Sequence, residues 1–139
     1  MKFYTIGYGG RKPQEFVDLL RQKGIRVIVD VRLRPHRAYR SYYAKAKSQN
    51  KGIQNLLAAG GIEYVSAPEL GNVFMEYDDW REQYQQRLEK DGDLLTEPLK
   101  SIPGPFCLMC AEKRITGCHR LEIADYLVRM KGFEVEHLE

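Results

Sequence analysis

The apolar residues of this chain alternate between short strand-like runs and helix-like spacing, and this alternation most limits the folds open to it. Residues 27–31 form a nearly continuous β-branched run, with Asp30 as the one charge inside it. Such a run is typical of a strand covered on both faces. Before it, Pro13 opens a helix-like segment that stops at Gly24. Strands and helices in this order predict an α/β domain.

The same reasoning extends along the chain. We expect strands at residues 3–7, 27–31, 63–67, 106–110 and 133–138, separated by helices. A short helix is expected around residues 53–57. A second helix carries Trp80, Tyr84 and Leu88 on the side that faces the core, and Asp79 and Glu82 are placed as a capping pair at its start. A third runs from about residue 119 to 130 and buries Ile123, Ala124, Leu127 and Val128. The predicted architecture is a three-layer α/β/α sandwich around a mostly parallel sheet of about five strands, with residues 1–139 as a single domain.

Composition excludes several classes of protein. Hydrophobic residues make up 43% of the chain and charged residues 29%, which is close to the average for globular proteins and argues against disorder. The longest apolar stretches are far shorter than the roughly 18 residues that span a bilayer. The first ten residues lack the apolar core and cleavage site of a secretory signal. We therefore expect a cytoplasmic protein with no membrane association.

The charge of the chain is unevenly distributed. No acidic residue lies between Asp30 and Glu63, and the basic segment (residues 32–51) carries seven Arg and Lys residues, which leaves 15 basic and 19 acidic residues elsewhere. This asymmetry predicts an anionic partner, either a small molecule or nucleic acid. Tyr39, Tyr42 and Tyr43 are interleaved with the cations, as in platforms on which single-stranded bases stack. The alternative is an ordinary solvated basic loop.

Open parallel sheets collect functional groups beyond the carboxyl ends of their strands. The residues at these ends are therefore candidate site residues. They are Gly7 and Tyr8 after the first strand, Arg32, Arg34 and Pro35 after the second, Glu69 and Gly71 after the third, and Cys110 and Glu112 after the fourth.

The segment from Cys110 to Arg120 holds the strongest candidates for chemistry. Cys110 follows a strand and Cys118 lies near a helix N-terminus, where cations and the helix dipole favour a thiolate. Arg120 and the first backbone amides of that helix would bind an anion beside the thiols. His119 would act as acid, base or thiol partner, oriented by Glu112. The alternative is that either cysteine only caps the helix or packs against the loop.

The other cysteine, a metal site and the two arginines after the second strand are also candidate functional features. Cys107 lies inside the strand and is expected only to pack, since it and Cys110 point to opposite faces. Cys118 and His119 are adjacent, and no fourth ligand is evident, so we expect no metal and no cofactor. Arg32 and Arg34, beside the turn of Gly7 and Tyr8, suit capture of an anion. The alternative is a structural salt bridge, with Asp30, Glu69 or Glu112 as the acid.

Six ordered motifs carry a resemblance to a known family: TIGYGG, FVDLLRQKGI, VDVRLRP, PELG, LMCAE and CHR. From residue 3 to 138 the chain resembles the domain-of-unknown-function 488 family. The matching positions are Asp30, Arg32, Pro35, Glu69, Leu70, Gly71, Cys110, Glu112, Cys118, His119 and Arg120. Tyr8 and Gly9 stand where this family commonly has His and Ser. The resemblance implies fold and site and brings no established activity.

A looser similarity is to rhodanese-like sulfurtransferases. Asp30, Arg32 and Cys110 match their outline, but the basic residue expected five positions after the cysteine is Ile115 here.

The preferred hypothesis is an enzyme of the cysteine-dependent transferase or hydrolase kind that acts on an anionic substrate. Its nucleophile is Cys110 and its second or resolving thiol is Cys118, with His119 and Glu112 as an acid/base pair. Arg32, Arg34 and Arg120 clamp the anion, and Asp30, Pro35, Glu69 and Gly71 support the site. The alternatives are a nucleic-acid-binding module that uses the basic segment and a redox switch formed by the two thiols.

Overall fold

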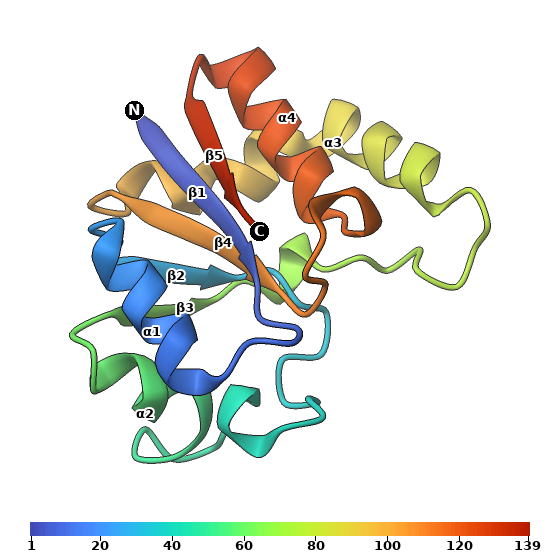
Figure 1. Cartoon of the computed structure of the whole chain (residues 1–139). Coiled ribbons are helices and arrows are strands. Elements are labelled where there is room, and N and C mark those ends of the chain that lie inside the picture. Colours follow the sequence, from blue (N-terminus) through green and yellow to red (C-terminus); the bar gives the residue numbers. More distant parts are fainter.

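The computed structural model describes all 139 residues and contains one five-stranded sheet (Figure 1). The strands are β1 (Lys2–Gly7), β2 (Val27–Asp30), β3 (Glu63–Ser66), β4 (Phe106–Cys110) and β5 (Glu134–Leu138). They lie in the order β3-β2-β4-β1-β5, and every neighbouring pair is parallel. The sheet is thus wholly parallel, where the sequence predicted a mostly parallel one.

Four α-helices cover the two faces of the sheet. They are α1 (Pro13–Gln22), α2 (Gly52–Ala58), α3 (Trp80–Thr96) and α4 (Arg120–Lys131). The buried residues of α1 and α2 pack on one face and those of α3 and α4 on the other (Figure 1). Short 3-10 helices connect them: η1 (Ser41–Tyr43), η2 (Pro68–Leu70), η3 (Glu97–Ser101) and η4 (Ile115–Gly117). The predicted α/β/α sandwich is confirmed.

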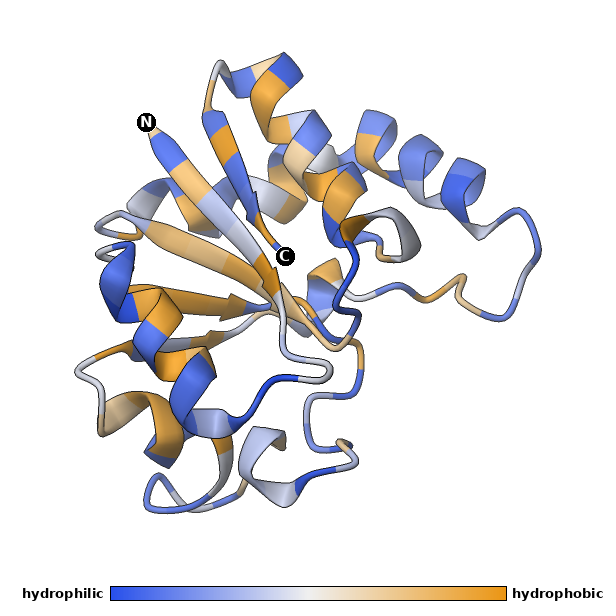
Figure 2. Cartoon of the chain, in the orientation of Figure 1, coloured by the Kyte–Doolittle hydropathy of each residue, from blue (hydrophilic) through white to orange (hydrophobic).

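The central strand β4 shows why its sequence is apolar throughout. Phe106, Leu108 and Cys110 pack with α3 and α4, whereas Cys107 and Met109 pack with α1 and α2. All five side chains are buried, because a central parallel strand has helices on both sides. Figure 2 shows the same arrangement as orange central strands between helices that are partly blue and partly orange.

Two local predictions were wrong. The Asp79 carboxylate precedes α3 but makes no cap hydrogen bond to it, and it instead accepts a hydrogen bond from the Gln83 side chain at 2.7 Å. Val128 is 39% exposed, because the inner face of α4 is already occupied by Ile123, Ala124 and Leu127. By length and hydropathy, no helix in the structure qualifies as a membrane span.

The topology creates a crevice where β2 and β4 end. These strands are neighbours in the sheet, but the helix after β2 packs on one face and the helix after β4 on the other. The chain therefore diverges beyond the two carboxyl ends, which is where open α/β sheets bind ligands.

Candidate functional site

A cavity of about 420 Å³ opens beyond the carboxyl ends of β2 and β4. Of the site residues predicted from the sequence, six line it: Arg32, Arg34, Cys110, Glu112, Cys118 and His119. Seven further residues complete the wall: Leu33, Arg37, Asn72, Met75, Ala111, Trp80 and Gly117. The structure therefore brings six of the strand-end residues and their neighbours to one cavity, although the strand-end argument did not identify the whole wall.

The two site cysteines meet at the floor of this cavity. Cys110 ends β4 and Cys118 lies just before α4, and their sulfur atoms are in direct bonding contact across the cysteine loop (residues 110–118). Both side chains are almost fully buried, at 4% and 3% exposure. Cys107 is the remaining cysteine, fully buried on the other face, where burial raises the pKa of its thiol. Cys110 and Cys118 form a disulfide in the structure, so reduction of that bond gives the cavity a pair of thiols.

Arg120 lies beneath the cavity floor and contacts the Cys110 sulfur. Its Nη1 atom donates to Cys110 Sγ at 2.8 Å and to the Glu112 carbonyl oxygen at 2.6 Å, and Nη2 donates to the Lys113 carbonyl oxygen at 3.3 Å. The side chain is fully buried, forms no ion pair with a carboxylate, and leaves Nε without a partner. We expected Arg120 to bind a ligand anion, but it does not line the cavity and instead faces the thiol.

Burial also changes the pKa of Arg120. It lowers the pKa of the guanidinium to about 10, with partial compensation from nearby acidic groups. Arg120 therefore remains a cation at neutral pH. Of the three groups that accept its hydrogen bonds, the sulfur of Cys110 is the one that can carry a negative charge.

His119 is oriented by the backbone and faces Cys118. Its Nε2 atom lies 2.9 Å from the Val31 carbonyl oxygen, which assigns the proton to Nε2, and its Nδ1 atom lies 3.8 Å from Cys118 Sγ. Burial lowers the pKa of His119 to about 4, so the ring is neutral at pH 7. Its free Nδ1 lone pair faces the Cys118 sulfur and can accept a hydrogen bond from that thiol.

The predicted pairing of His119 with Glu112 is absent. Glu112 is exposed, and its carboxylate makes no hydrogen bond and no ion pair, whereas His119 is held by the Val31 carbonyl. The part of Glu112 that the site uses is its backbone carbonyl, which accepts from Arg120.

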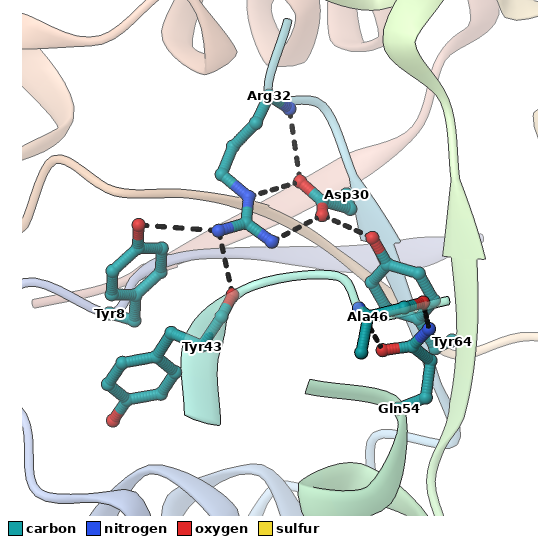
Figure 3. Close-up of polar contacts among 7 residues, drawn as sticks. All are labelled: Tyr8, Asp30, Arg32, Tyr43, Ala46, Gln54 and Tyr64. Atoms are coloured by element: carbon teal, nitrogen blue, oxygen red, sulfur yellow. Dashed lines mark hydrogen bonds and ion pairs between the residues drawn. The ribbon is translucent and has the colours of Figure 1, made fainter. Parts of the chain in front are cut away.

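Arg32 is held in a buried polar network (Figure 3). Its Nε and Nη2 atoms donate to the two carboxylate oxygens of Asp30 at 2.9 and 2.7 Å. Its Nη1 atom donates to the Tyr43 carbonyl oxygen at 2.8 Å and to the Tyr8 hydroxyl oxygen at 3.3 Å. The Tyr64 hydroxyl donates to Asp30 at 2.5 Å. Burial opposes the charge of Arg32, but Asp30 outweighs it and raises the pKa of the guanidinium.

The two arginines of the predicted pair therefore differ. Arg32 forms the structural salt bridge to Asp30 that was the alternative interpretation. Arg34 and Arg37 line the cavity, are exposed, and form no ion pair and no side-chain hydrogen bond. The cations open to a ligand are thus Arg34 and Arg37, and sequence analysis had not singled out Arg37 for this site.

The remaining predicted residues lie around the cavity without lining it. A side chain at Gly7 would overlap the Glu112 carbonyl, so glycine is needed where β1 meets the cysteine loop. Tyr8 is buried and stacks on Tyr43 at 4.4 Å. Gly71 packs closely on the backbone of Leu33. The carbonyl oxygen of Pro35 accepts a hydrogen bond from the Lys45 amide at 2.8 Å. Glu69 is exposed, and its side chain has no hydrogen-bond partner.

Sequence reasoning missed the apolar part of the wall. Trp80 shares a helix face with Tyr84 and Leu88, and we assigned all three to the core. Tyr84 and Leu88 are buried there, but Trp80 is only half-buried and lines the cavity with Met75. The available signal was the run of apolar residues among acids just before Trp80. No group of three His, Cys, Asp or Glu residues that could hold a metal is present.

Comparison with known proteins identifies a family. A family model described as domain of unknown function DUF488 matches residues 12–127, which include Asp30, Arg32 and the cysteine loop. Comparison with curated proteins and comparison with solved structures each returned no match. The looser similarity to rhodanese-like domains stays a prediction.

Proposed function

The chain belongs to the family described as domain of unknown function DUF488, and from the site of this member we propose that it is a cysteine-dependent protein whose two thiols act on a small anionic substrate. The observation that carries this proposal is the 2.8 Å contact between Arg120 and Cys110.

The first step of the argument concerns charge. A buried cation without a counter-charge is costly, on the order of several kcal/mol, and Arg120 has no carboxylate partner. Ionisation of Cys110 supplies the missing negative charge at hydrogen-bond distance. Thiolates are the reactive form of cysteine and are favoured beside such cations. Cys110 is therefore the nucleophile.

The second thiol gives the first a way to release product. The Cys110 thiolate attacks an electrophilic sulfur of the substrate, a new S–S bond forms, and the substrate's leaving group departs with the electron pair. Cys118, whose sulfur faces Nδ1 of His119, then loses its proton to solvent and attacks the Cys110 sulfur, which lies within bonding distance. This step forms the Cys110–Cys118 disulfide and releases the remaining substrate sulfur as a thiolate. The substrate gains two electrons, and the protein loses two.

Arg34 and Arg37 supply the preference for an anion. Both line the cavity, and neither is neutralised by an ion pair. Glu112 is the one acidic residue that lines the cavity. The two arginines outnumber it, so the net charge of these three side chains is positive. Arginine side chains suit carboxylate, sulfate and phosphate groups because their donors form a planar fork.

The proposal is tested by the pH dependence of cysteine alkylation. The reduced native protein is treated with iodoacetamide at pH 6 and pH 8, and each cysteine is followed by peptide mass spectrometry. An ordinary thiol with a pKa near 8.5 loses about 80-fold in rate between these pH values, whereas Cys110 should lose only a few-fold. Cys107, fully buried, is the internal control and should stay unmodified. A Cys110 rate that follows the ordinary thiol overturns the proposal.

A second candidate function rests on the basic segment. Tyr39 is 93% exposed, and the Arg40 guanidinium stacks over its ring at 5.0 Å, in a stretch that contains seven cations and no acid. An exposed ring with adjacent cations suits a single-stranded nucleic acid. Oligonucleotide affinity should then fall steeply with salt and should weaken in Tyr39→Ala. No binding even at low salt removes this candidate.

A further inference from the structure

The apolar residues of the cavity wall suggest a narrower class of substrate for the proposed thiol site. Met75 lies in the segment between η2 and α3, Trp80 is the first residue of α3, and both line the cavity. Met75 is 56% exposed, and neither residue belongs to a core cluster. Their apolar surface is therefore not used by the fold.

Trp80 is held in place although it is outside the core. The Arg81 guanidinium lies over the Trp80 ring at 4.6 Å. Arg81 is itself fixed, because it is paired with Glu122 on α4 and donates to the Thr116 carbonyl oxygen at 2.6 Å. The indole is thus a preorganised surface next to the cysteine loop, and such surfaces stack well on flat ligand groups.

Three chemically different surfaces therefore meet in one cavity. The thiols form its floor, Arg34 and Arg37 form a cationic side, and Met75 and Trp80 form an apolar side. A volume of about 420 Å³ lies toward the lower end of the range for small-molecule sites. The occupant is therefore a small molecule with one group for each surface.

Resting on the proposed thiol function, we propose that the substrates are small disulfides in which an aromatic group carries the anionic charge. The carboxylate or a similar anion binds Arg34 and Arg37, the ring packs on Trp80 and Met75, and one disulfide sulfur faces Cys110. With an aryl disulfide Ar–S–S–Ar, attack by Cys110 releases one Ar–S⁻. Attack by Cys118, after its proton passes to solvent, releases the second Ar–S⁻ and leaves the protein disulfide.

The test compares four disulfides that separate charge from aromatic character. They are 5,5′-dithiobis(2-nitrobenzoate), which is anionic and aromatic, 4,4′-dithiodipyridine, which is neutral and aromatic, 3,3′-dithiodipropionate, which is anionic and aliphatic, and cystamine, which is cationic and aliphatic. Each rate with the reduced protein is divided by the rate of the same disulfide with free 2-mercaptoethanol, which removes differences in intrinsic reactivity. We expect the normalised rate of the anionic aryl disulfide to exceed each of the others by about tenfold.

Variants assign this preference to the two sides of the cavity. Arg34→Gln and Arg37→Gln should reduce the ratio of the normalised rate of the anionic aryl disulfide to that of the neutral aryl disulfide. They should leave its ratio to the rate of the anionic aliphatic disulfide unchanged. Trp80→Leu should do the reverse. The matched controls are Arg26→Gln, at the other end of β2, and Tyr77→Leu, an exposed aromatic residue that does not line the cavity. Both controls should behave as the unmodified protein.

The possible failures are distinguishable. If Cys110 reacts readily but all four normalised rates agree, the inference is overturned and the thiol function stands. The same holds if Trp80→Leu changes nothing. If Cys110 reacts with none of the disulfides faster than an ordinary buried thiol, the proposed function itself fails.

Discussion

Arg120 is the residue on which the chemistry of the site depends most. Replacing it with methionine, which has a similar length and no charge, should remove the reason for Cys110 to ionise. In Arg120→Met the alkylation rate of Cys110 should fall by about 80-fold between pH 8 and pH 6, as for an ordinary thiol. Arg120→Lys, which keeps the charge, should stay close to the unmodified protein. A flat pH profile in Arg120→Met would contradict this role, and urea unfolding of both variants checks that they are folded.

His119 should make stability depend on pH. Burial lowers the pKa of this residue in the folded protein to about 4 from its ordinary value of 6.5, so between these values the unfolded chain binds a proton that the folded protein does not. Stability should therefore fall as the pH drops from 7 toward 4. At pH 4.5 this contribution amounts to about 2–3 kcal/mol.

Urea denaturation of the protein and of His119→Gln at pH 7 and pH 4.5 measures this contribution. The two proteins share every titratable group except His119, so the difference between them isolates His119. The loss on acidification should be smaller in the variant by that amount. Equal losses would show that His119 does not resist protonation.

Only those site residues whose side chains are themselves reactive could be predicted from the sequence. Cys110, Cys118 and His119 stand out in the sequence because thiols and imidazole are reactive groups. Their partners do not stand out. The orienting group of His119 is the carbonyl of Val31, 88 positions away, and a backbone carbonyl leaves no mark on the sequence.

At the scale of elements, the junction of β1 with the cysteine loop is the tightest part of the site. The amides of Tyr8 and Gly9 donate to the carbonyls of Cys110 and Ala111 at 3.1 and 2.9 Å, and Gly7 allows the close approach. Gly7→Ala should lower the free energy of unfolding by about 1–3 kcal/mol because the new methyl group displaces the loop. Gly117→Ala, in the same loop but with open space around it, is the control. Similar urea midpoints for the two variants would contradict this.

Helices and strands were predicted from periodicity, but periodicity does not say where a helix extends past the sheet. The spacing of Trp80, Tyr84 and Leu88 gives one common face. It cannot show that the first turn of α3 lies over the cavity while the later turns lie over the core. This is why Trp80 was assigned to the core and why the apolar side of the cavity was missed.

At the scale of the whole molecule, the fold class followed from the alternation of elements, but the strand order did not. β1 pairs with β4 and β5, which are more than a hundred residues away in sequence, and local patterns do not specify such pairings. The strand order matters for the site, because it makes β2 and β4 neighbours and so brings the segment with Arg34 beside the cysteine loop.

This arrangement also predicts how the molecule responds to oxidation. The Cys110 and Cys118 sulfurs are bonded to each other in the structure, so mild oxidation of the reduced protein should lower its intact mass by about 2 Da, the loss of two hydrogen atoms, without joining two chains. Because the bond lies within one loop at the carboxyl end of the central strand β4, the far-UV circular dichroism should not change. The oxidised protein should resist alkylation until a dithiol reductant restores it. Cys118→Ser should form no internal disulfide and should instead give a mixed disulfide at Cys110. If the protein loses no mass, or links Cys107 instead, the two thiols do not work as a pair.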